Sequence, residues 1–176
     1  LEATVTEVDG RKGSSSDLAL KHAVLLSLLQ LVRELSTDAN SSAAMVGEGL
    51  VTLLVQAMRA ARGIRDPTLP IAVEVTWNCL EHSQNAMDNG PPAECRTSLI
   101  RKARKTNAAF ALSTWDGVAA LRDTVEALLI GGFRNKDKEL RNEAVIVASQ
   151  LSSNSRSHPL FRSTGMLLLL LRYATA

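Results

Sequence analysis

The chain has 176 residues, of which 45% are hydrophobic, 3% aromatic and 22% charged, and its formal net charge is +2. A chain of this length can bury a sizeable core, built here mainly from Leu, Val and Ala. The small net charge provides no overall attraction to nucleic acids or anionic membranes, so any charge signal must be local. Two cysteines are too few for a disulfide framework, which favours a reducing, intracellular compartment.

No stretch of the sequence predicts a membrane segment. The longest unbroken apolar run, residues 166–171, is far shorter than the roughly 20 residues that cross a bilayer. The amino terminus lacks the basic and apolar regions of a secretory signal. No polar capping helix follows Tyr173, so we expect the chain to be an excerpt from a longer protein.

The first predicted unit spans about residues 17–63, after a flexible or extended lead-in over residues 1–16 that is rich in Gly and Ser. Ser16 or Asp17 is expected to cap its first helix. Apolar residues then follow helical spacing, in a stripe wide enough to indicate burial on more than one side: Leu18, Val24, Leu25, Leu28, Leu29, Leu31, Val32 and Leu35.

The same unit continues with a polar break at residues 36–40 and a short helix at residues 41–46. Gly47 and Gly49 follow, and a third helix is predicted over residues 50–61. Gly63 and the Asp66-Pro67 pair end that helix.

A second predicted unit spans residues 70–133. Its first helix carries Val73, Thr76, Trp77 and Leu80 in the places that Leu28, Leu31, Val32 and Leu35 hold in the first unit. An insert at residues 87–107 opens with Asn-Gly-Pro-Pro, which cannot be helical, and closes with the basic sequence IRKARK.

After the insert we expect a short helix over residues 107–112. Asp116 is expected to cap a long helix over residues 118–130, in which Gly117 is the opening glycine and Gly131-Gly132 is the stop.

The third predicted unit spans residues 137–176. Its first helix carries Leu140, Ala144, Val147, Ala148 and Leu151, and a polar break follows at residues 152–157. Pro159 restarts a short helix, which Gly165 stops. The run at residues 166–171 is apolar on every side, so we expect a helix buried against neighbours above and below it.

The spacing of these features predicts an internal repeat. Leu35 precedes Gly49 by 14 positions, and Leu151 precedes Gly165 by 14 positions. Once about 23 extra residues of the insert are set aside, the steps between the opening glycines are 45 and 48 residues. These periods lie near the roughly 40–47 residues of HEAT and armadillo repeats.

The residues that end the first helices and open the last ones carry a family resemblance. LLQLVRELST, VTWNCLEHS and AVIVASQLSS, with GEGLVTLLVQAM, WDGVAALRDTVEALL and STGMLLLLL, resemble the armadillo-repeat superfamily. The resemblance implies an all-α, right-handed, armadillo/HEAT-like α-solenoid of about three repeats with a loop insertion in the middle repeat. KDKELRNEAVIVASQL and FRSTGMLLLLLRYAT look most like armadillo proteins of the central-pair apparatus of cilia and flagella.

One departure from the superfamily concerns its nuclear-import receptors, which bind peptides with a Trp and an Asn four positions later. Here Trp77 and Asn78 are adjacent, and Ala119 lies four positions after Trp115. The sequence therefore does not indicate import-receptor activity.

The residues that could form a catalytic or metal site are better explained structurally, with Cys79 as a small core residue. Cys79 and His82 have ligand spacing on one helix, with Cys95 a loop away, but His22 and His158 are not placed to complete a zinc site. A Cys79–His82 pair also lacks a third group to orient the base. We expect no catalytic residues, no metal and no cofactor. We interpret Trp77 as core, and Glu139, Arg141, Asn142 and Glu143 as a solvated helix face.

The leading functional hypothesis is a non-enzymatic scaffold for protein–protein interaction within a larger complex, in the cytoplasm or cytoskeleton and, under the ciliary resemblance, in the axoneme. The expected partner-binding residues are the cations of the insert, Arg101, Lys102, Arg104 and Lys105, on a helix re-formed over residues 98–105. Three of them share one face and repel one another, so an acidic partner segment such as a tubulin tail would suit them. The alternative is that the insert is a solvated loop without a binding role.

Two other function classes remain open at this point. One is a nucleic-acid-binding solenoid, although no aromatic residues that could stack bases accompany the basic run. The other is a regulatory domain of a larger enzyme. The fold prediction specifies its own core, in which the following residues should be buried: Leu28, Leu31, Leu35, Leu53, Leu54, Trp77, Leu80, Leu121, Val147, Leu151, Leu169 and Leu170.

Overall fold

The structure, a computed structural model, describes residues 15–61, 63, 65–88, 106–130 and 135–174, and these residues form an all-α fold without strands. The helices follow one another in three groups of long, short and medium length. The first group is α1 (Ser15–Ser36), α2 (Ala39–Gly47) and α3 (Leu50–Ala60). The second is α4 (Thr68–Asp88), α6 (Ala108–Leu112) and α7 (Trp115–Ile130), and the third is α8 (Asn135–Ser152), α9 (Ser157–Ser163) and α10 (Met166–Ala174).

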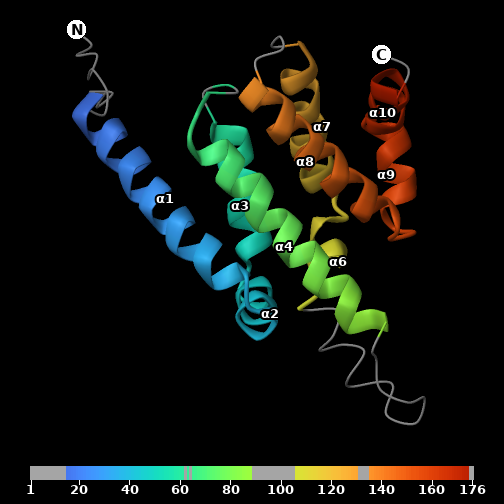
Figure 1. Cartoon of the computed structure of the whole chain (residues 1–176), viewed down its shortest axis with the longest axis horizontal. Helices are drawn as coiled ribbons and strands as arrows, with labels where there is room; N and C mark the ends of the chain where they lie inside the picture. Colours follow the sequence, from blue (N-terminus) through green and yellow to red (C-terminus); the bar gives the residue numbers. More distant parts are fainter. Residues whose placement is uncertain (1–14, 62, 64, 89–105, 131–134, 175–176) are drawn as a thin grey trace, which may run out of the picture.

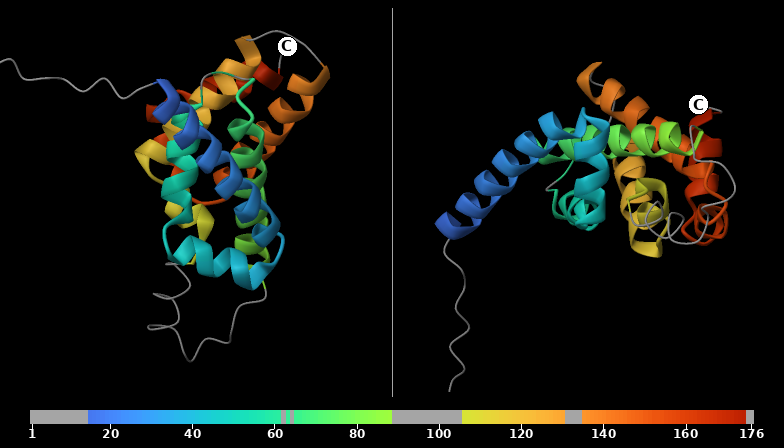
Figure 2. Two further views of the ribbon diagram at one scale, coloured as in Figure 1. Left: turned by 90° about the vertical axis from the view of Figure 1, so that its left-hand side faces the viewer. Right: turned by 90° about the horizontal axis from the view of Figure 1, so that it is seen from below.

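Helices of the same class lie side by side. The long helices α1, α4 and α8 form one layer, in which α4 packs between the other two (Figure 1). The medium helices α3, α7 and α10 pack on one another in a second layer, which Figure 2 shows on the opposite side of the molecule. Because α4 also packs on α3, and α8 on α7, the three groups share one continuous hydrophobic core.

Two kinds of residue set the starts of the shorter helices, and the sequence predicts the second kind, the opening glycines. The Asp38 carboxylate accepts a hydrogen bond from the Ser41 amide at 2.8 Å and caps α2. Gly49 and Gly165, with φ of 98° and 77°, directly precede α3 and α10. This left-handed conformation strains other residues but costs glycine little, so the two glycines allow the chain to turn sharply between the short and the medium helix.

The predicted caps of the two longer helices are wrong. Ser16 and Asp17 lie inside α1, which already begins at Ser15. Asp116 lies in the first turn of α7 and pairs with Arg59 across 2.7 Å. The cap of α7 is Thr114, whose hydroxyl accepts a hydrogen bond from the Gly117 amide at 3.1 Å.

Gly117 is therefore not the counterpart of Gly49 and Gly165. It lies inside α7, and its φ is not positive. A Cβ atom at this position would stand 2.3 Å from the Leu112 carbonyl oxygen. Close approach of backbone to backbone, and not an unusual φ, makes glycine necessary here.

Of the twelve residues predicted to be buried, six are buried, three are half-buried and three are exposed. Leu54, Leu80, Leu121, Val147, Leu151 and Leu169 are buried. Leu53, Trp77 and Leu170 are half-buried and pack against the core, which agrees with a core role for Trp77. Leu28, Leu31 and Leu35 are exposed, because α1 turns Leu25, Leu29 and Val32 towards α4 and no described element covers its other side.

Two further expectations fail at the third group. The helix α10 buries Met166 and Leu169, but Leu167, Leu168 and Leu171 are exposed, since no described element lies beyond it. Arg141, expected on a solvated face with its neighbours Asn142 and Glu143, is buried, and its guanidinium carbon lies 5.3 Å from the centre of the Tyr173 ring.

None of the described helices is by itself long and apolar enough to span a membrane. The helices α2 and α3 would suffice by length and composition only as a pair, and they are bent by 81° at the break between them.

Polar contacts join the first group to the second. His22 on α1 lies 3.1 Å from the buried Asp66 carboxylate, and Arg33 pairs with Glu74 on α4 across 2.9 Å. The Asn78 amide donates a hydrogen bond to the hydroxyl of buried Ser36 at 2.9 Å. The relative position of α1 and α4 is therefore set by directional contacts as well as by apolar packing.

Candidate functional site

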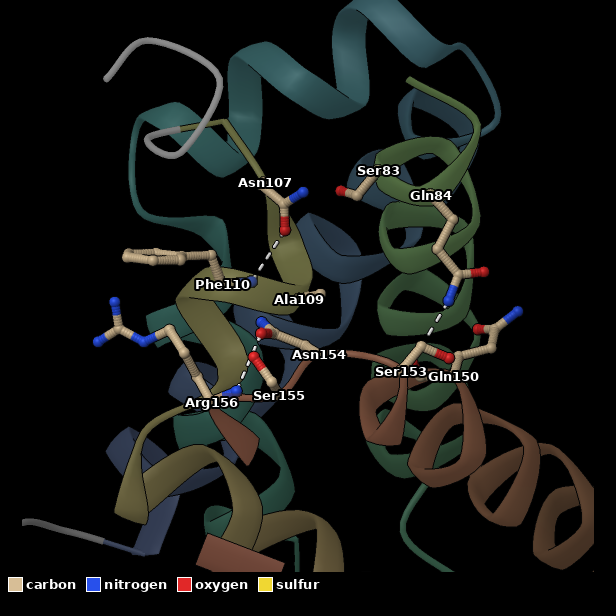
Figure 3. Close-up of a pocket in the computed structure, with 10 residues that line it drawn as sticks. All are labelled: Ser83, Gln84, Asn107, Ala109, Phe110, Gln150, Ser153, Asn154, Ser155 and Arg156. Atoms are coloured by element: carbon tan, nitrogen blue, oxygen red, sulfur yellow. Dashed lines mark hydrogen bonds between the residues drawn. The ribbon is translucent and has the colours of Figure 1, made fainter. Parts of the chain in front are cut away.

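A pocket of ≈ 390 Å³ opens between the second and third helix groups. It lies where α4 and α8 approach their carboxyl ends, beside α6 and the turn between α8 and α9 (Figure 3). Its described lining residues are mostly amides and hydroxyls: Ser83, Gln84, Asn107, Ala109, Phe110, Gln150, Ser153, Asn154, Ser155 and Arg156.

The α6 side of the pocket is held by two capping contacts. Asn107 Oδ1 accepts a hydrogen bond from the Phe110 amide at 2.8 Å, so this side chain starts the short helix. Ser83 Oγ accepts a hydrogen bond from the Ala108 amide at 2.9 Å and donates one to the Cys79 carbonyl at 2.7 Å. These bonds fix the first turn of α6 against α4.

The opposite wall is the turn between α8 and α9, which Asn154 organises. Its Oδ1 accepts a hydrogen bond from the Arg156 amide at 3.2 Å, and its Nδ2 donates one to Ser113 Oγ at 3.1 Å. The second bond crosses from the third helix group to the second. The turn is thereby positioned over α6, and the pocket walls come from two groups that are locked together.

A cation stands at the edge of the pocket. The guanidinium carbon of Arg156 lies 4.0 Å from the centre of the Phe110 ring, within cation–π distance, while the Arg156 side chain remains exposed. Stacking restricts this long side chain without neutralising its charge. An anionic group entering the pocket would therefore meet a positioned positive charge.

One residue of the lining, Gln150, carries a buried side-chain amide oxygen. Gln84 Nε2 donates a hydrogen bond to the Gln150 main-chain carbonyl at 3.3 Å and so ties α4 to α8. The side-chain Oε1 of Gln150 is buried and has no hydrogen-bond partner among the described residues. A buried acceptor of this kind costs free energy until a donor reaches it, which is what a ligand N–H group supplies.

The chemistry of this lining suits binding. No carboxylate, imidazole or thiol occurs among the described residues that line the pocket, so they offer no acid–base pair near neutral pH. They do offer amide donors and acceptors, hydroxyls, an aromatic face and one guanidinium. This combination matches the N–H and C=O groups of a polypeptide and an acidic side chain.

The four cations predicted as the binding site, Arg101, Lys102, Arg104 and Lys105, lie outside the described residues, as does the rest of residues 89–105. Their place in the sequence still relates them to the pocket. Lys105 precedes Asn107, a lining residue, by two positions, and Ser83 and Gln84 lie in the α4 helix that leads into the segment.

Cys79 belongs to the core, as we expected from the sequence. It is buried, and Ser42 Oγ donates a hydrogen bond to its sulfur at 3.3 Å. Burial raises the pKa of the Cys79 thiol, and the Ser42 hydrogen bond opposes that shift. Among the described residues no group of three or more His, Cys, Asp or Glu side chains could hold a metal ion, and Cys95 lies outside them.

Sequence reasoning missed the pocket, since its residues are divided between α4, α6 and the turn after α8. The available signal was the pair of asparagines, Asn107 and Asn154, each followed closely by a short helix. Comparisons of the chain with protein-family models, with curated proteins and with solved structures find no match.

Proposed function

We propose that this chain is an armadillo-like, right-handed α-solenoid that acts as a non-enzymatic protein-interaction scaffold. The solenoid interpretation is supported by the stacking of like helices in three successive groups. It is also supported by the equal spacing of 14 positions from Leu35 to Gly49 and from Leu151 to Gly165. The polar pocket between the second and third groups carries the functional proposal, because its lining offers binding groups without an acid–base pair.

The ligand we propose is an acidic polypeptide segment of a partner protein. Its main chain would hydrogen bond with the amide side chains of Gln84, Gln150 and Asn154, and its carboxylates would meet Arg156. The basic run ends two positions before Asn107, a residue of the pocket lining. Its charges would add electrostatic attraction for the same acidic segment. A nucleic acid is the weaker candidate, because Arg156 already occupies a face of Phe110 on which a base could stack.

The test is a titration of a fluorescent glutamate-rich peptide, followed by anisotropy at low and moderate salt. Arg156→Ala should weaken binding about tenfold, because a hydrogen bond to a charged group contributes about 1.5–3 kcal/mol and the exposure of Arg156 favours the lower end of that range. Arg162→Ala is the matched control, because Arg162 is an exposed arginine of α9 that does not line the pocket. Replacing Arg101, Lys102, Arg104 and Lys105 together by Ala should weaken binding and reduce its salt dependence.

Two outcomes would contradict this proposal. The first is equal affinity of the wild type, the Arg156→Ala variant and the Arg162→Ala variant. The second is tighter binding of a single-stranded oligonucleotide of equal charge than of the peptide, with a loss of oligonucleotide affinity on the same substitutions. That result would assign the site to nucleic acid.

The resemblance to armadillo proteins of cilia and flagella supports a narrower proposal, that the partner is axonemal and the acidic segment is a tubulin tail. Tagged chain expressed in ciliated cells should then co-localise with the axoneme, and it should pellet with microtubules. Microtubules whose acidic tails have been removed by a protease should retain much less of it. Equal retention would exclude tubulin tails as the ligand, but it would not contradict the binding of another acidic segment in the pocket.

A further inference from the structure

The two ends of the helix stack expose apolar side chains on opposite sides of the molecule. At one end α1 presents Val24, Leu28, Leu31 and Leu35, here called the head face, with exposed fractions of 50%, 50%, 57% and 44%. At the other end α10 presents Leu167 and Leu171, here called the tail face, with exposed fractions of 46% and 56%. Figure 1 places α1 and α10 at opposite edges of the fold.

The first and third groups share one register, which allows the faces to be compared with the interior. Asp38 and Asn154 each accept a hydrogen bond from a main-chain amide just after a long helix. Gly49 and Gly165 each take a positive φ directly before a medium helix. Both pairs are separated by 116 residues, so that offset relates α1 to α8 and α3 to α10.

The head face corresponds to an interface that the molecule already makes. At an offset of 116 residues its counterparts on α8 are Leu140, Ala144, Val147 and Leu151, with exposed fractions of 8%, 0%, 0% and 0%. The helix α8 packs on α4 and α7, which belong to the group before it. The same side of a long helix is therefore buried in the third group and uncovered in the first.

The tail face corresponds to the other half of such an interface. The counterparts of Leu167 and Leu171 are Val51 and Val55 on α3, with exposed fractions of 6% and 8%. The helix α3 packs on α4 and α7, which belong to the group after it. Inside the molecule, the corresponding side of α8 is covered by a long and a medium helix of the preceding group, α4 and α7. In the last group the equivalent long and medium helices are α8 and α10.

We infer that the head face of one copy of this chain binds the tail face of a second copy and so continues the stack from one molecule into the next. Each copy carries both halves of an interface that its own interior repeats, which makes a second copy the partner that these faces fit. The contact is heterologous, because different surfaces of the two copies meet, so further copies can add. It does not depend on any ligand of the polar pocket.

Sedimentation velocity of the whole chain over a dilution series tests this inference. The wild type should form species that grow beyond dimers as its concentration rises. Leu31→Glu blocks the head and Leu171→Glu blocks the tail, so each variant alone should sediment as a monomer. An equimolar mixture should form dimers and nothing larger, because only one head and one tail remain able to meet.

Matched variants separate this result from misfolding and from general stickiness. Trp115→Glu alters a large exposed residue of α7 on neither face and should associate like the wild type. Leu28→Lys and Leu167→Lys replace the first pair if circular dichroism shows that either glutamate variant is unfolded. A monomeric wild type at every concentration, a dimer formed by one blocked variant alone, or a mixture that stays monomeric would each overturn the inference.

Discussion

At the residue scale, two glycines show that one amino acid can be required for different physical reasons. Gly49 adopts a positive φ, and nothing lies within 4 Å of its missing Cβ. Gly117 adopts an ordinary φ, but a Cβ would stand 2.3 Å from the Leu112 carbonyl oxygen. Sequence spacing alone could not distinguish these roles, and the prediction that Gly117 opens its helix was wrong for that reason.

The close approach at Gly117 leads to a stability prediction. Gly117→Ala should destabilise the fold by about 1–3 kcal/mol, because the backbone around Leu112 would have to shift to accept a methyl group. Urea unfolding measures the change. Gly47→Ala is the control, since its nearest atom would be the Thr106 methyl at 3.4 Å, and it should change stability by no more than about 0.5 kcal/mol. Equal effects of the two substitutions would show that α7 does not approach Leu112 as described.

Glu143 on α8 predicts a pH dependence. Burial, followed by the like charges of Glu74 and Glu139, raises the pKa of Glu143 above its ordinary value. A carboxyl group whose pKa is raised by folding destabilises the fold as the pH rises from the unfolded pKa through the folded one. Glu143→Gln should therefore raise the melting temperature at neutral pH, and the gain should vanish below about pH 4, where the acid is neutral in both states.

Exposed Glu81 on α4 supplies the control, and Glu81→Gln should change the melting temperature at neutral pH little, because the side chain is at the surface. A lower melting temperature for Glu143→Gln at neutral pH would mean that the charged carboxylate is favourable in the fold. In that case neither burial nor the like charges of Glu74 and Glu139 would dominate the electrostatics of Glu143.

At the element scale, the orientation of α1 gives a paired prediction. Leu29 is fully buried and its neighbour Leu28 is half exposed. Leu29→Ala should cost about 2–5 kcal/mol of stability, whereas Leu28→Ala should cost less than about 1 kcal/mol. Denaturant unfolding at low protein concentration compares them without contact between copies. A larger loss for Leu28 than for Leu29 would reverse the assigned orientation of the helix.

The same helix shows how far the sequence predicts the fold and where it stops. Apolar spacing predicted the existence and approximate bounds of α1, α3 and α8. The helix α1, however, carries two apolar stripes, and a pattern cannot tell which of them a neighbour covers. The exposed Leu28, Leu31 and Leu35 form the stripe that α4 does not cover, and only the packing of whole helices decides that.

The candidate site was less predictable than the helices. Its residues come from α4, α6 and the turn between α8 and α9, and a pocket assembled from three separated segments has no local sequence signature. What the sequence does carry is the capping chemistry of Asn107 and Asn154, which positions the walls. The predicted cations at residues 101–105 lie outside the described residues and stay a prediction.

At the scale of the whole molecule, three helix groups that share one core present an inner pocket and two apolar ends. The two proposals assign separate tasks to these parts, with ligand binding between the groups and assembly at the ends. The tasks are separable by mutation, because Arg156 lies in neither end face and Leu31 and Leu171 do not line the pocket.

The central claim, that the polar pocket binds an acidic polypeptide segment, is tested most directly by photo-crosslinking. A glutamate-rich peptide with a photoreactive group at its centre would be irradiated with the whole chain, and the attachment sites would be found by mass spectrometry. We expect attachment to the pocket lining on α4, α6 and residues 150–156, and excess unlabelled peptide should abolish it. Attachment confined to α1 and α10, or unaffected by competition, would contradict it.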